Sequence, residues 1–355
     1  MKHRRGKIKV GLVGIGRAGW GMHRRELEKL PRLFKVVAAC DVDRKRCRQA
    51  AEALGCRTYT DIRGLASDPE VELVDITTRS VDHADQAIVA VKAGKPVFME
   101  KPIAVSYVEA KKMGRAAKRA GVEIYARHNR RFEPAFQHVR EIIDSAGLGE
   151  VHSIKLCRGG YQRRADWQTI LKYGGGQLLN WGPHVIDHAL QLLDAPVADM
   201  WSDLQRIAAA GDAEDCVRII LKGENGRLAD VQIGGGMAIR EPECTVHGSR
   251  GSIVVRGREI QMRYLSPRQK LARLRAKTST PPKEGGFGNP EKLRWVEKTV
   301  PVKPRRRVDV GTSIWRHLYA AMRKGEPFPI KWEEALEVMR IIDLARKGTE
   351  FELPG

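Results

Sequence analysis

No hydrophobic run in this chain is long enough to cross a membrane. Nowhere in the 355 residues do the ~18–20 consecutive apolar residues of a spanning helix occur. A twin arginine, Arg4-Arg5, precedes an apolar run near the start, which is also the order found in export signals. That run is short, contains glycine and lysine, and leads straight into a glycine-rich loop, so we interpret it as a strand. We therefore expect a cytoplasmic protein with no membrane partner.

Cysteine is scarce as well. None of the six cysteines belongs to a C-x-x-C pair, which argues against a zinc knuckle and against a disulfide framework. Too few histidine and aspartate residues gather in any one segment to complete a metal site, so we expect no metal.

Acidic residues are outnumbered by basic ones, 43 against 64, and the net charge is +21. Such a field favours nucleic acid, acidic lipid or an acidic substrate. The basic residues concentrate at Lys2–Lys9, Arg268–Lys277 and Lys303–Arg307. Aromatic residues make up only 6% of the chain and none interrupts these runs, whereas nucleic-acid sites combine charge with stacking side chains. We interpret the runs as solvated surface and expect no nucleic-acid partner.

The chain has the composition of a globular protein, with 42% hydrophobic and 30% charged residues, and a length that suits two domains. Up to residue 129, short apolar runs alternate with amphipathic segments. The runs span residues 9–15, 35–41, 73–78, 96–100 and 123–126, and the amphipathic segments span 24–30, 44–54, 83–93 and 106–120. This alternation is typical of parallel strands covered by helices. We predict an α/β domain over residues 1–128 with a doubly wound parallel sheet of the Rossmann type.

Beyond residue 129 the rhythm changes. Apolar segments 217–222 and 227–232 flank Asn225-Gly226, a strong hairpin turn, and further short strands follow at 245–246, 252–255 and 259–264. Helices are predicted at 133–146, 308–324 and 332–346. We predict that residues 129–355 form an α+β domain with an open, mostly antiparallel sheet for substrate binding and oligomerisation. Residues 266–292, rich in proline, glycine and lysine, are predicted to be a mobile insertion.

A G-x-G-x-x-G pattern, Gly14, Gly16 and Gly19, directly follows the first apolar run. The first glycine allows a tight turn, the second lets the backbone approach a pyrophosphate, and the third permits close helix packing. Asp41 lies at the end of the next strand, where a carboxylate can bind the ribose hydroxyls. These residues predict binding of NAD. Basic residues at 44–46 could accommodate the extra phosphate of NADP, so NADP stays possible.

Glu100-Lys101-Pro102 follows another apolar run. Ligands of open α/β sheets bind beyond the carboxyl ends of the strands, so Lys101 would project toward the cofactor. A lysine beside a positively charged nicotinamide would hold its proton less tightly and could exchange it or donate a hydrogen bond. Glu100 could hold the lysine in place. An ordinary surface lysine after a strand is the alternative.

A second polar cluster lies in Gly174–Leu190. Asn180, His184 and Asp187 are spaced i, i+4 and i+7, so they share one face of a helix. His184 could accept the proton of a substrate hydroxyl, although a structural histidine is an equal alternative. Asp187 could orient the imidazole or bind substrate hydroxyls. Because Pro183 is tolerated only in the first turn of a helix, we expect the helix to begin at Asn180 as its N-cap.

Taken together, these motifs resemble the glucose–fructose oxidoreductase, inositol dehydrogenase and rhizopine-catabolism family (Gfo/Idh/MocA). The resemblance rests on the glycine loop, the Glu-Lys-Pro motif and the Gly174–Leu190 segment in this order, and it covers nearly the whole chain. HNRRF at His128–Phe132 is similar to the segment between the family's domains, and Glu333–Gly348 is similar to its C-terminal helix.

The resemblance implies a Rossmann domain followed by an open-sheet domain that forms dimers or tetramers. It also implies Lys101 and His184 as the catalytic pair and places His83 and Glu100 near the cofactor. The chain departs from the family pattern at Asn180, where an aspartate is usual. An asparagine can fix the tautomer of His184 by hydrogen bonding, but it cannot support an imidazolium charge.

We therefore expect an NAD(P)-dependent oxidoreductase that transfers hydride between nicotinamide and a carbinol carbon of a sugar, polyol or sugar acid. Arg164 and Trp167 are well placed to bind this carbohydrate-like substrate, and the arginine suggests that it is acidic. Two alternatives stay open. One is a glycoside-cleaving enzyme that uses NAD transiently. The other is a non-catalytic dinucleotide sensor whose basic surface contacts nucleic acid and whose binding would weaken steeply with salt.

Overall fold

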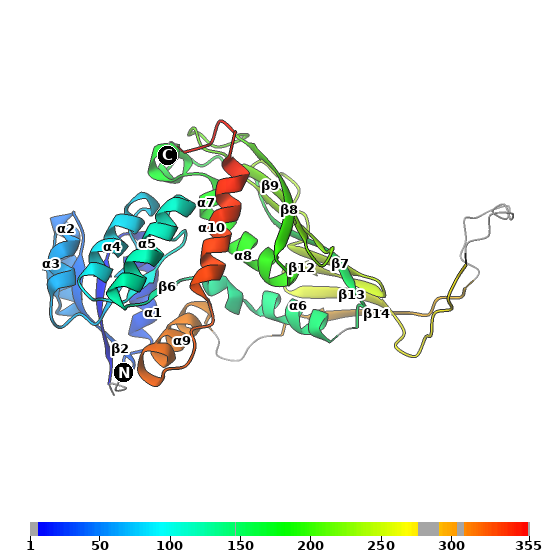
Figure 1. Cartoon of the computed structure of the whole chain (residues 1–355), viewed down its shortest axis with the longest axis horizontal. Coiled ribbons are helices and arrows are strands. Elements are labelled where there is room, and N and C mark those ends of the chain that lie inside the picture. Colours follow the sequence, from blue (N-terminus) through cyan, green and yellow to red (C-terminus); the bar gives the residue numbers. More distant parts are fainter. Residues whose placement is uncertain (1–5, 146, 276–290, 304–308, 354–355) are drawn as a thin grey trace.

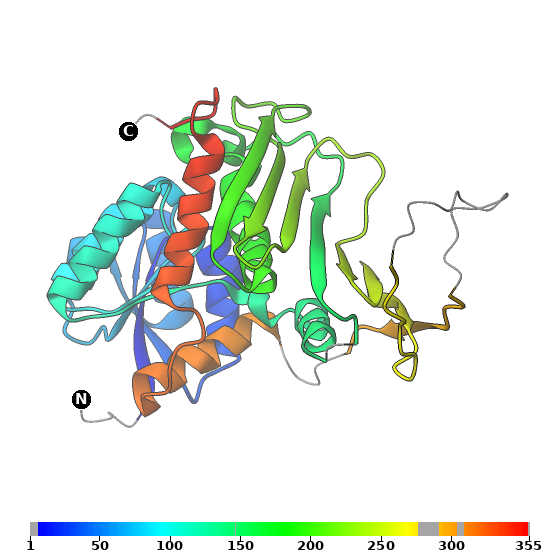
Figure 2. The same cartoon turned by 45° about the vertical axis from the view of Figure 1, so that its right-hand side comes forward.

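A computed structural model of the chain describes residues 6–145, 147–275, 291–303 and 309–353. It contains two sheets, and helix α10 (Trp332–Arg346) runs between them (Figures 1 and 2). This helix packs against α5 and β6 on one side and against α8 and β8 on the other. Buried side chains from both halves of the chain form one contiguous cluster, so the two sheets share a hydrophobic core.

The first sheet has six parallel strands in the order β3-β2-β1-β4-β5-β6. Its strands are β1 (Ile8–Val13), β2 (Phe34–Cys40), β3 (Arg57–Tyr59), β4 (Leu73–Ile76), β5 (Val97–Met99) and β6 (Ile124–Ala126). The strand order reverses between β1 and β4, which pair directly. Ligands of such sheets bind at this point, beyond the carboxyl ends of the strands. The predicted doubly wound α/β sheet is confirmed.

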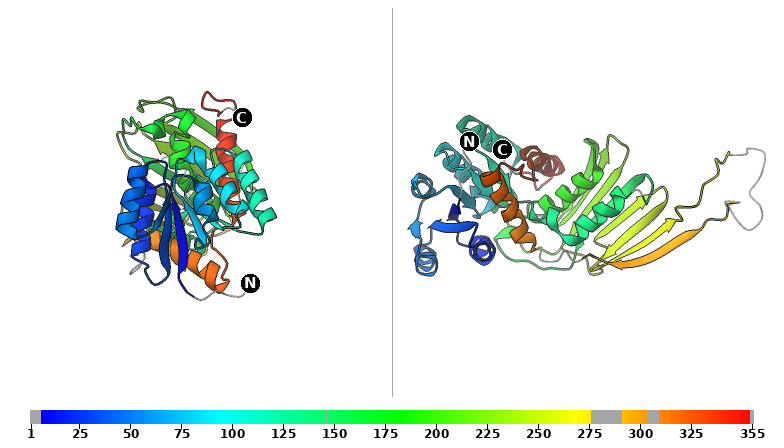
Figure 3. Two further views of the ribbon diagram at one scale, coloured as in Figure 1. Left: turned by 90° about the vertical axis from the view of Figure 1, so that its left-hand side faces the viewer. Right: turned by 90° about the horizontal axis from the view of Figure 1, so that it is seen from below.

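Helices cover both faces of this sheet (Figure 3). They are α1 (Arg24–Glu28), α2 (Arg44–Leu54), α3 (Ile62–Ser67), α4 (His83–Lys92) and α5 (Tyr107–Ala120). α1 begins at Arg24, as predicted, and a π-helical turn that was not predicted, η1 (Gly19–His23), precedes it directly after the glycine loop. The short β3 and α3 were not predicted.

The second sheet has eight strands in the order β14-β13-β12-β11-β7-β10-β9-β8. The strands are β7 (Val151–Gly159), β8 (Val197–Gln205), β9 (Cys216–Gly223), β10 (Leu228–Gly234), β11 (Cys244–Gly248), β12 (Gly251–Arg256), β13 (Glu259–Leu265) and β14 (Trp295–Pro301). Among the strands of this sheet that the structure describes, only β7 and β10 pair in parallel, which confirms the mostly antiparallel sheet. Both edge strands, β8 and β14, were missed. Most of the predicted mobile insertion, 276–290, lies outside the described residues.

Four more helices complete the described fold around the second sheet and return the chain to the first. α6 (Pro134–Asp144), α7 (Gln177–Asn180) and α8 (Gly182–Leu193) lie on the second half, and α8 packs against β7 and β10. α9 (Val310–Lys324) packs on α1 instead. Its Trp315 is fully buried, with its ring centroid 4.5 Å from that of Phe98 in β5. Residues near the end of the chain therefore support the strand that carries the Glu-Lys-Pro motif.

Among the described residues, no helix has the length and apolarity needed to cross a bilayer.

Candidate functional site

The glycine loop opens onto a cavity at the carboxyl ends of the parallel strands. Gly14 has φ of 88°, which favours glycine, and a Cβ there would lie 2.8 Å from Thr78. A Cβ at Gly19 would overlap the carbonyl oxygen of Gly14, so the third glycine lets the helix approach the strand. A Cβ at Gly16 would meet only Arg46, at 4.0 Å. The space over Gly16 is therefore free for a ligand and not filled by the fold.

Asp41 lies just beyond β2, beside the same loop. Its Oδ2 accepts a hydrogen bond from the Ile15 backbone N–H at 2.8 Å, and Oδ1 accepts one from Asp43 at 2.9 Å. The guanidinium of Arg46 lies 3.4 Å from Oδ2 and is half exposed. Oδ2 thus accepts from both Ile15 and Arg46, while Oδ1 keeps a further lone pair for a ribose hydroxyl. The guanidinium of Arg46 thus lies next to the carboxylate of Asp41, where the 2′-phosphate of NADP would lie.

Lys101 projects from the end of β5 into the cavity and reaches α7. Its Nζ donates to the backbone oxygen of Asn180 at 2.8 Å and lies 3.5 Å from Asn180 Oδ1. Burial, together with the guanidiniums of Arg17 and Arg130, lowers the pKa of Lys101 to about 8 against the attraction of Glu100. An amine with this pKa can lose and regain a proton near neutral pH.

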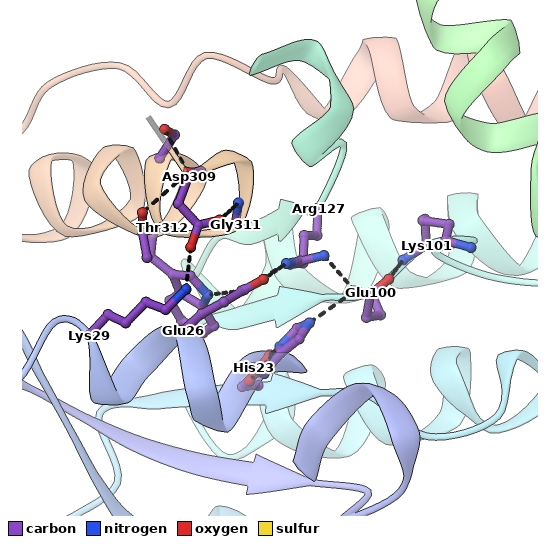
Figure 4. Close-up of polar contacts among 12 residues, drawn as sticks. His23, Glu26, Lys29, Glu100, Lys101, Arg127, Asp309, Gly311 and Thr312 are labelled. Atoms are coloured by element: carbon purple, nitrogen blue, oxygen red, sulfur yellow. Dashed lines mark hydrogen bonds and ion pairs between the residues drawn. The ribbon is translucent and has the colours of Figure 1, made fainter. Parts of the chain in front are cut away.

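The carboxylate of Glu100 belongs to a buried network of charges behind Lys101 (Figure 4). It accepts hydrogen bonds from Arg127 at 2.8 Å, from His23 at 2.9 Å and from the backbone N–H of Lys101 at 2.9 Å. Burial alone would raise the pKa of Glu100, but Arg127 and His23 outweigh it and hold the pKa well below its ordinary value. Glu100 is thus an ionised anchor that fixes the backbone of the next residue.

The network continues away from the cavity. The other ring nitrogen of His23 faces Asp75 at 2.9 Å. Burial would lower the pKa of His23, but Asp75 and Glu100 raise it to about 9, so the ring carries a charge at neutral pH. Arg127 also binds both oxygens of Glu26, at 2.7 and 2.8 Å, and Trp315 donates to Glu26 at 2.8 Å. Contacts therefore run from α9 to the edge of the sheet where Lys101 lies.

The glycine triplet before α7 makes room for a buried carboxylate. Gly176 has φ of 105°, and a Cβ there would overlap the carboxylate of Glu214. Glu214 accepts hydrogen bonds from the backbone N–H of Leu178 at 2.9 Å and thereby caps the start of α7. The prediction that Asn180 is the N-cap was wrong, because Asn180 is the last residue of α7 and Trp181 is the N-cap of α8. Pro183 does lie in the first turn of α8, as expected.

His184 lines the same cavity as Lys101 and Asn180, which has a volume of about 1300 Å³. Only 7% of its surface is exposed, and its buried Nδ1 has no hydrogen-bond partner in the described part of the chain. Burial, and then the charges of Lys101 and Arg130, keep the pKa of His184 well below its ordinary value. It is a neutral imidazole with an unsatisfied nitrogen, which is the kind of group that a bound hydroxyl satisfies.

The structure brings most of the remaining candidates to this cavity. His83 borders it, but its Nδ1 lies 2.7 Å from the Pro102 carbonyl and its Nε2 lies 3.3 Å from that of Thr78, so its nitrogens brace two loops. Arg164 and Trp167 also line it. Asp187 does not reach it: its carboxylate is buried and held by Arg131 at 2.5–3.1 Å.

Several lining residues were missed by sequence reasoning. Thr77 closes the glycine loop, because its Oγ1 donates to the Gly14 carbonyl at 2.6 Å. Arg79, Arg130 and Trp181 also line the cavity. Thr77 and Arg79 could have been found from their position after β4, since all parallel strands end at this edge. No local signal marks Arg130 or Trp181, which arrive from the second half of the chain.

No group of three or more histidine, cysteine, aspartate or glutamate side chains that could hold a metal is present in the described ranges.

The fold and the cavity define a class of protein: an oxidoreductase with a nicotinamide dinucleotide site. The open space over Gly16 and the turn at Gly14 fit the pyrophosphate, and the remaining acceptor site on Oδ1 of Asp41 fits a ribose hydroxyl. Residues 8–128 match the profile of an oxidoreductase family with an NAD-binding Rossmann fold, and residues 136–254 match the GFO/IDH/MocA C-terminal domain. The chain belongs to the Gfo/Idh/MocA family and is an NAD(P)-dependent oxidoreductase.

Two of the relatives are named as dehydrogenases. The chain is 26% identical to scyllo-inositol 2-dehydrogenase (NADP⁺) of Bacillus subtilis, over 97% of this chain and 94% of that protein. It is 33% identical to 1-carboxy-3-chloro-3,4-dihydroxycyclohexa-1,5-diene dehydrogenase of Comamonas testosteroni, over 64% of this chain and 58% of that protein. An NAD-binding protein from Listeria innocua shares the fold, with a TM-score of 0.80 and 22% identity over 98% of both chains.

Proposed function

We propose that this enzyme interconverts a ring alcohol and the corresponding ketone on a polyol, sugar or sugar acid, with Lys101 and His184 handling the hydroxyl proton. The observation that carries the proposal is the meeting of Lys101, Asn180 and His184 at one cavity, which the glycine loop and Asp41 also line. The bound dinucleotide would take up or return a hydride at the carbinol carbon. The names of the two relatives support a ring hydroxyl as the reacting group.

In this proposal Lys101 is the group that exchanges the proton. With a pKa of about 8, an appreciable fraction of its amine is neutral near pH 7–8 and can accept the proton of an alcohol. Asn180 positions the amine through its backbone oxygen, 2.8 Å from Nζ. In the reverse direction, the ammonium form would donate a proton to the oxygen of the ketone.

His184 is the second partner of the substrate hydroxyl. Because its pKa is well below the ordinary value, the ring is neutral and can both donate and accept a hydrogen bond. The ring of Trp181 lies edge-on to it, with centroids 5.8 Å apart, and restricts its movement. We infer that His184 orients the hydroxyl toward Lys101 and does not itself become charged.

Single and double variants test this pair. Lys101→Ala and His184→Ala should each reduce turnover by about 10²- to 10⁴-fold while dinucleotide affinity stays nearly unchanged. The double variant should lose less than the product of the two factors, because groups that act as a unit are not additive. Lys112→Ala, at an exposed position on α5, is the matched control. Wild-type activity in both single variants would contradict the assignment.

We also propose a cytoplasmic homodimer or homotetramer. What supports the location is the place of the first apolar run: it forms β1, which pairs with both β2 and β4, so its cleavage as a signal would remove a central strand. Cell fractionation tests the cytoplasmic location.

Exposed apolar surface on the second sheet supports assembly into an oligomer, because Trp201 is 55% exposed and Leu228 is 42% exposed. Light scattering of the purified protein tests the proposed homodimer or homotetramer, and a monomer would contradict it.

A further inference from the structure

Arginine is abundant around the cavity. Its lining includes six arginines from segments far apart in the sequence: Arg17, Arg46, Arg79, Arg127, Arg130 and Arg164. Binding a neutral polyol and a dinucleotide does not require six arginines. For each arginine we therefore ask whether a carboxylate of the chain or a phosphate of the dinucleotide balances its charge.

Three of the six are balanced by carboxylates of the chain. Arg127 is held by Glu26 and Glu100. Arg164 binds Asp166 through two nitrogens, with a closest distance of 2.8 Å. Arg46 lies beside Asp41 at the ribose end.

A fourth, Arg17, follows the second glycine of the loop. The phosphates of a dinucleotide bring their own negative charge to this position. Of the remaining two, Arg130 is also paired, with Glu133, and Arg79 has no ion pair in the described part of the chain.

Arg79 is an unbalanced cation that aromatic rings hold in place. Its guanidinium carbon lies 5.0 Å from the ring centroid of Tyr173 and 5.6 Å from that of Trp167, both in the loop after β7. In the described part of the chain, no carboxylate lies within ion-pair distance of it. Aromatic faces attract and orient a guanidinium, but they do not neutralise its charge.

Arg130 lies near Lys101 and His184, and its charge acts on both of them. It forms an ion pair with Glu133, but its guanidinium also lies 4.4 Å from the ring centroid of Trp181, which carries Arg158 at 3.9 Å. No carboxylate in the described ranges forms an ion pair with Arg158, although the charges of Glu133 and Glu243 act on it. The described lining of the cavity has five carboxylates, Asp41, Asp61, Asp82, Glu100 and Asp166, against seven cations, the six arginines and Lys101. The lining therefore has an excess of positive charge.

We propose that the substrate carries a carboxylate, which Arg79 binds in the field of Arg130 while the reacting hydroxyl faces Lys101 and His184. The planar fork of a guanidinium matches a carboxylate, and the rings of Trp167 and Tyr173 hold Arg79 ready for it. The substrate class is a hydroxylated ring acid: a hexuronic acid or a carboxylated cyclic polyol. This inference rests on the proposed function for the reacting hydroxyl, but the carboxylate site can be tested by binding alone.

The test compares matched pairs of compounds that differ by the acid group. Binding of D-glucuronate and D-glucose, D-galacturonate and D-galactose, and quinate and myo-inositol is measured by calorimetry on enzyme saturated with reduced dinucleotide. At least one acid should bind about tenfold or more tightly than its neutral partner. Arg79→Gln and Arg130→Gln should each weaken that acid about ten- to hundredfold and leave the neutral partner within about twofold. Arg115→Gln removes an exposed arginine of α5 that does not line the cavity, and it should change neither.

The outcomes separate this inference from the proposed function. Equal affinity for acids and neutral compounds, or no measurable binding of any acid, overturns the carboxylate site, whatever the enzyme does with neutral alcohols. A preference for D-glucose 6-phosphate without one for any carboxylate also overturns it. Acid binding that depends on Arg79, without hydride transfer to or from any member of the panel, supports the site and contradicts the proposed reaction.

Discussion

Replacing Glu100 by glutamine tests whether the buried network sets the behaviour of Lys101. The carboxylate is 6% exposed and accepts three hydrogen bonds of 2.8–2.9 Å, two of them from cations. Glutamine keeps the shape and one acceptor oxygen but leaves Arg127 and His23 facing each other without the shared negative charge. Removing one partner of a buried ion pair costs about 3–5 kcal/mol. Because glutamine can still accept a hydrogen bond, we expect a loss of about 3 kcal/mol in the free energy of unfolding.

The same change should alter the pH dependence of the reaction. Glu100 raises the pKa of Lys101, so its removal should bring that pKa below about 8. Alcohol oxidation needs the neutral amine, so the alkaline rise in kcat should move to lower pH in Glu100→Gln.

Urea unfolding and a pH–rate profile measure the two effects. Glu28→Gln, which removes an exposed carboxylate paired with Arg24, is the control and should cost less than about 1 kcal/mol. A rise in kcat that stays in place or moves to higher pH would refute the electrostatic link between Glu100 and Lys101.

Three further changes test the rest of the site. Gly16→Val should abolish dinucleotide binding with unchanged thermal stability, because the new side chain meets only Arg46 and otherwise fills ligand space; unchanged NAD affinity by titration would contradict the assignment of the loop. Asp41→Asn should increase the affinity for NADP relative to NAD, since it frees Arg46, 3.4 Å away, for the 2′-phosphate, and adding Arg46→Gln should cancel the gain. Asn180→Asp should raise the pKa of Lys101, 3.5 Å from Oδ1, and shift the alkaline rise in oxidation rate to higher pH; a neutral effect would mean that Asn180 acts only through its backbone.

Much of the fold could be predicted because its signals are local. Each apolar run and each amphipathic segment of the first half overlaps one element, with ends that differ by a few residues, and the glycine loop and the Glu-Lys-Pro motif lie within a few residues of a strand end. The elements that were missed are short or lie at an edge: β3 has three residues and α3 has six. The edge strands β8 and β14 have alternating exposed and partly buried residues without a continuous apolar run.

The wrong prediction at Asn180 shows what local spacing cannot supply. Asparagine is a good N-cap, and Asn180 lies three residues before Pro183, which belongs in the first turn of a helix. This argument holds when no other group caps the helix. Here Glu214, which lies 36 residues after Leu178, caps α7 by accepting a hydrogen bond from the backbone N–H of Leu178. The chain is therefore already helical when it reaches Asn180. Asn180 is then free to turn its backbone oxygen toward Lys101. A tertiary contact replaced a local cap, and the sequence around residue 180 carries no sign of it.

The charged network shows the same limit of prediction from local sequence. The position of Lys101 depends on contacts between residues that lie far apart in the chain. Trp315 donates to Glu26 across 289 residues, and Glu26 holds Arg127, which holds Glu100. Gly311, at the start of α9, has no side chain where a Cβ would overlap the carboxylate of Glu26, so the helix can approach this closely. Each link is a buried polar group that would be costly if left unpaired, so the contacts stabilise one another and leave one position for the backbone of Lys101. The parallel sheet thus supplies the cavity, while the orientation of Lys101, the proposed catalytic lysine, rests on a helix formed more than 200 residues later in the chain.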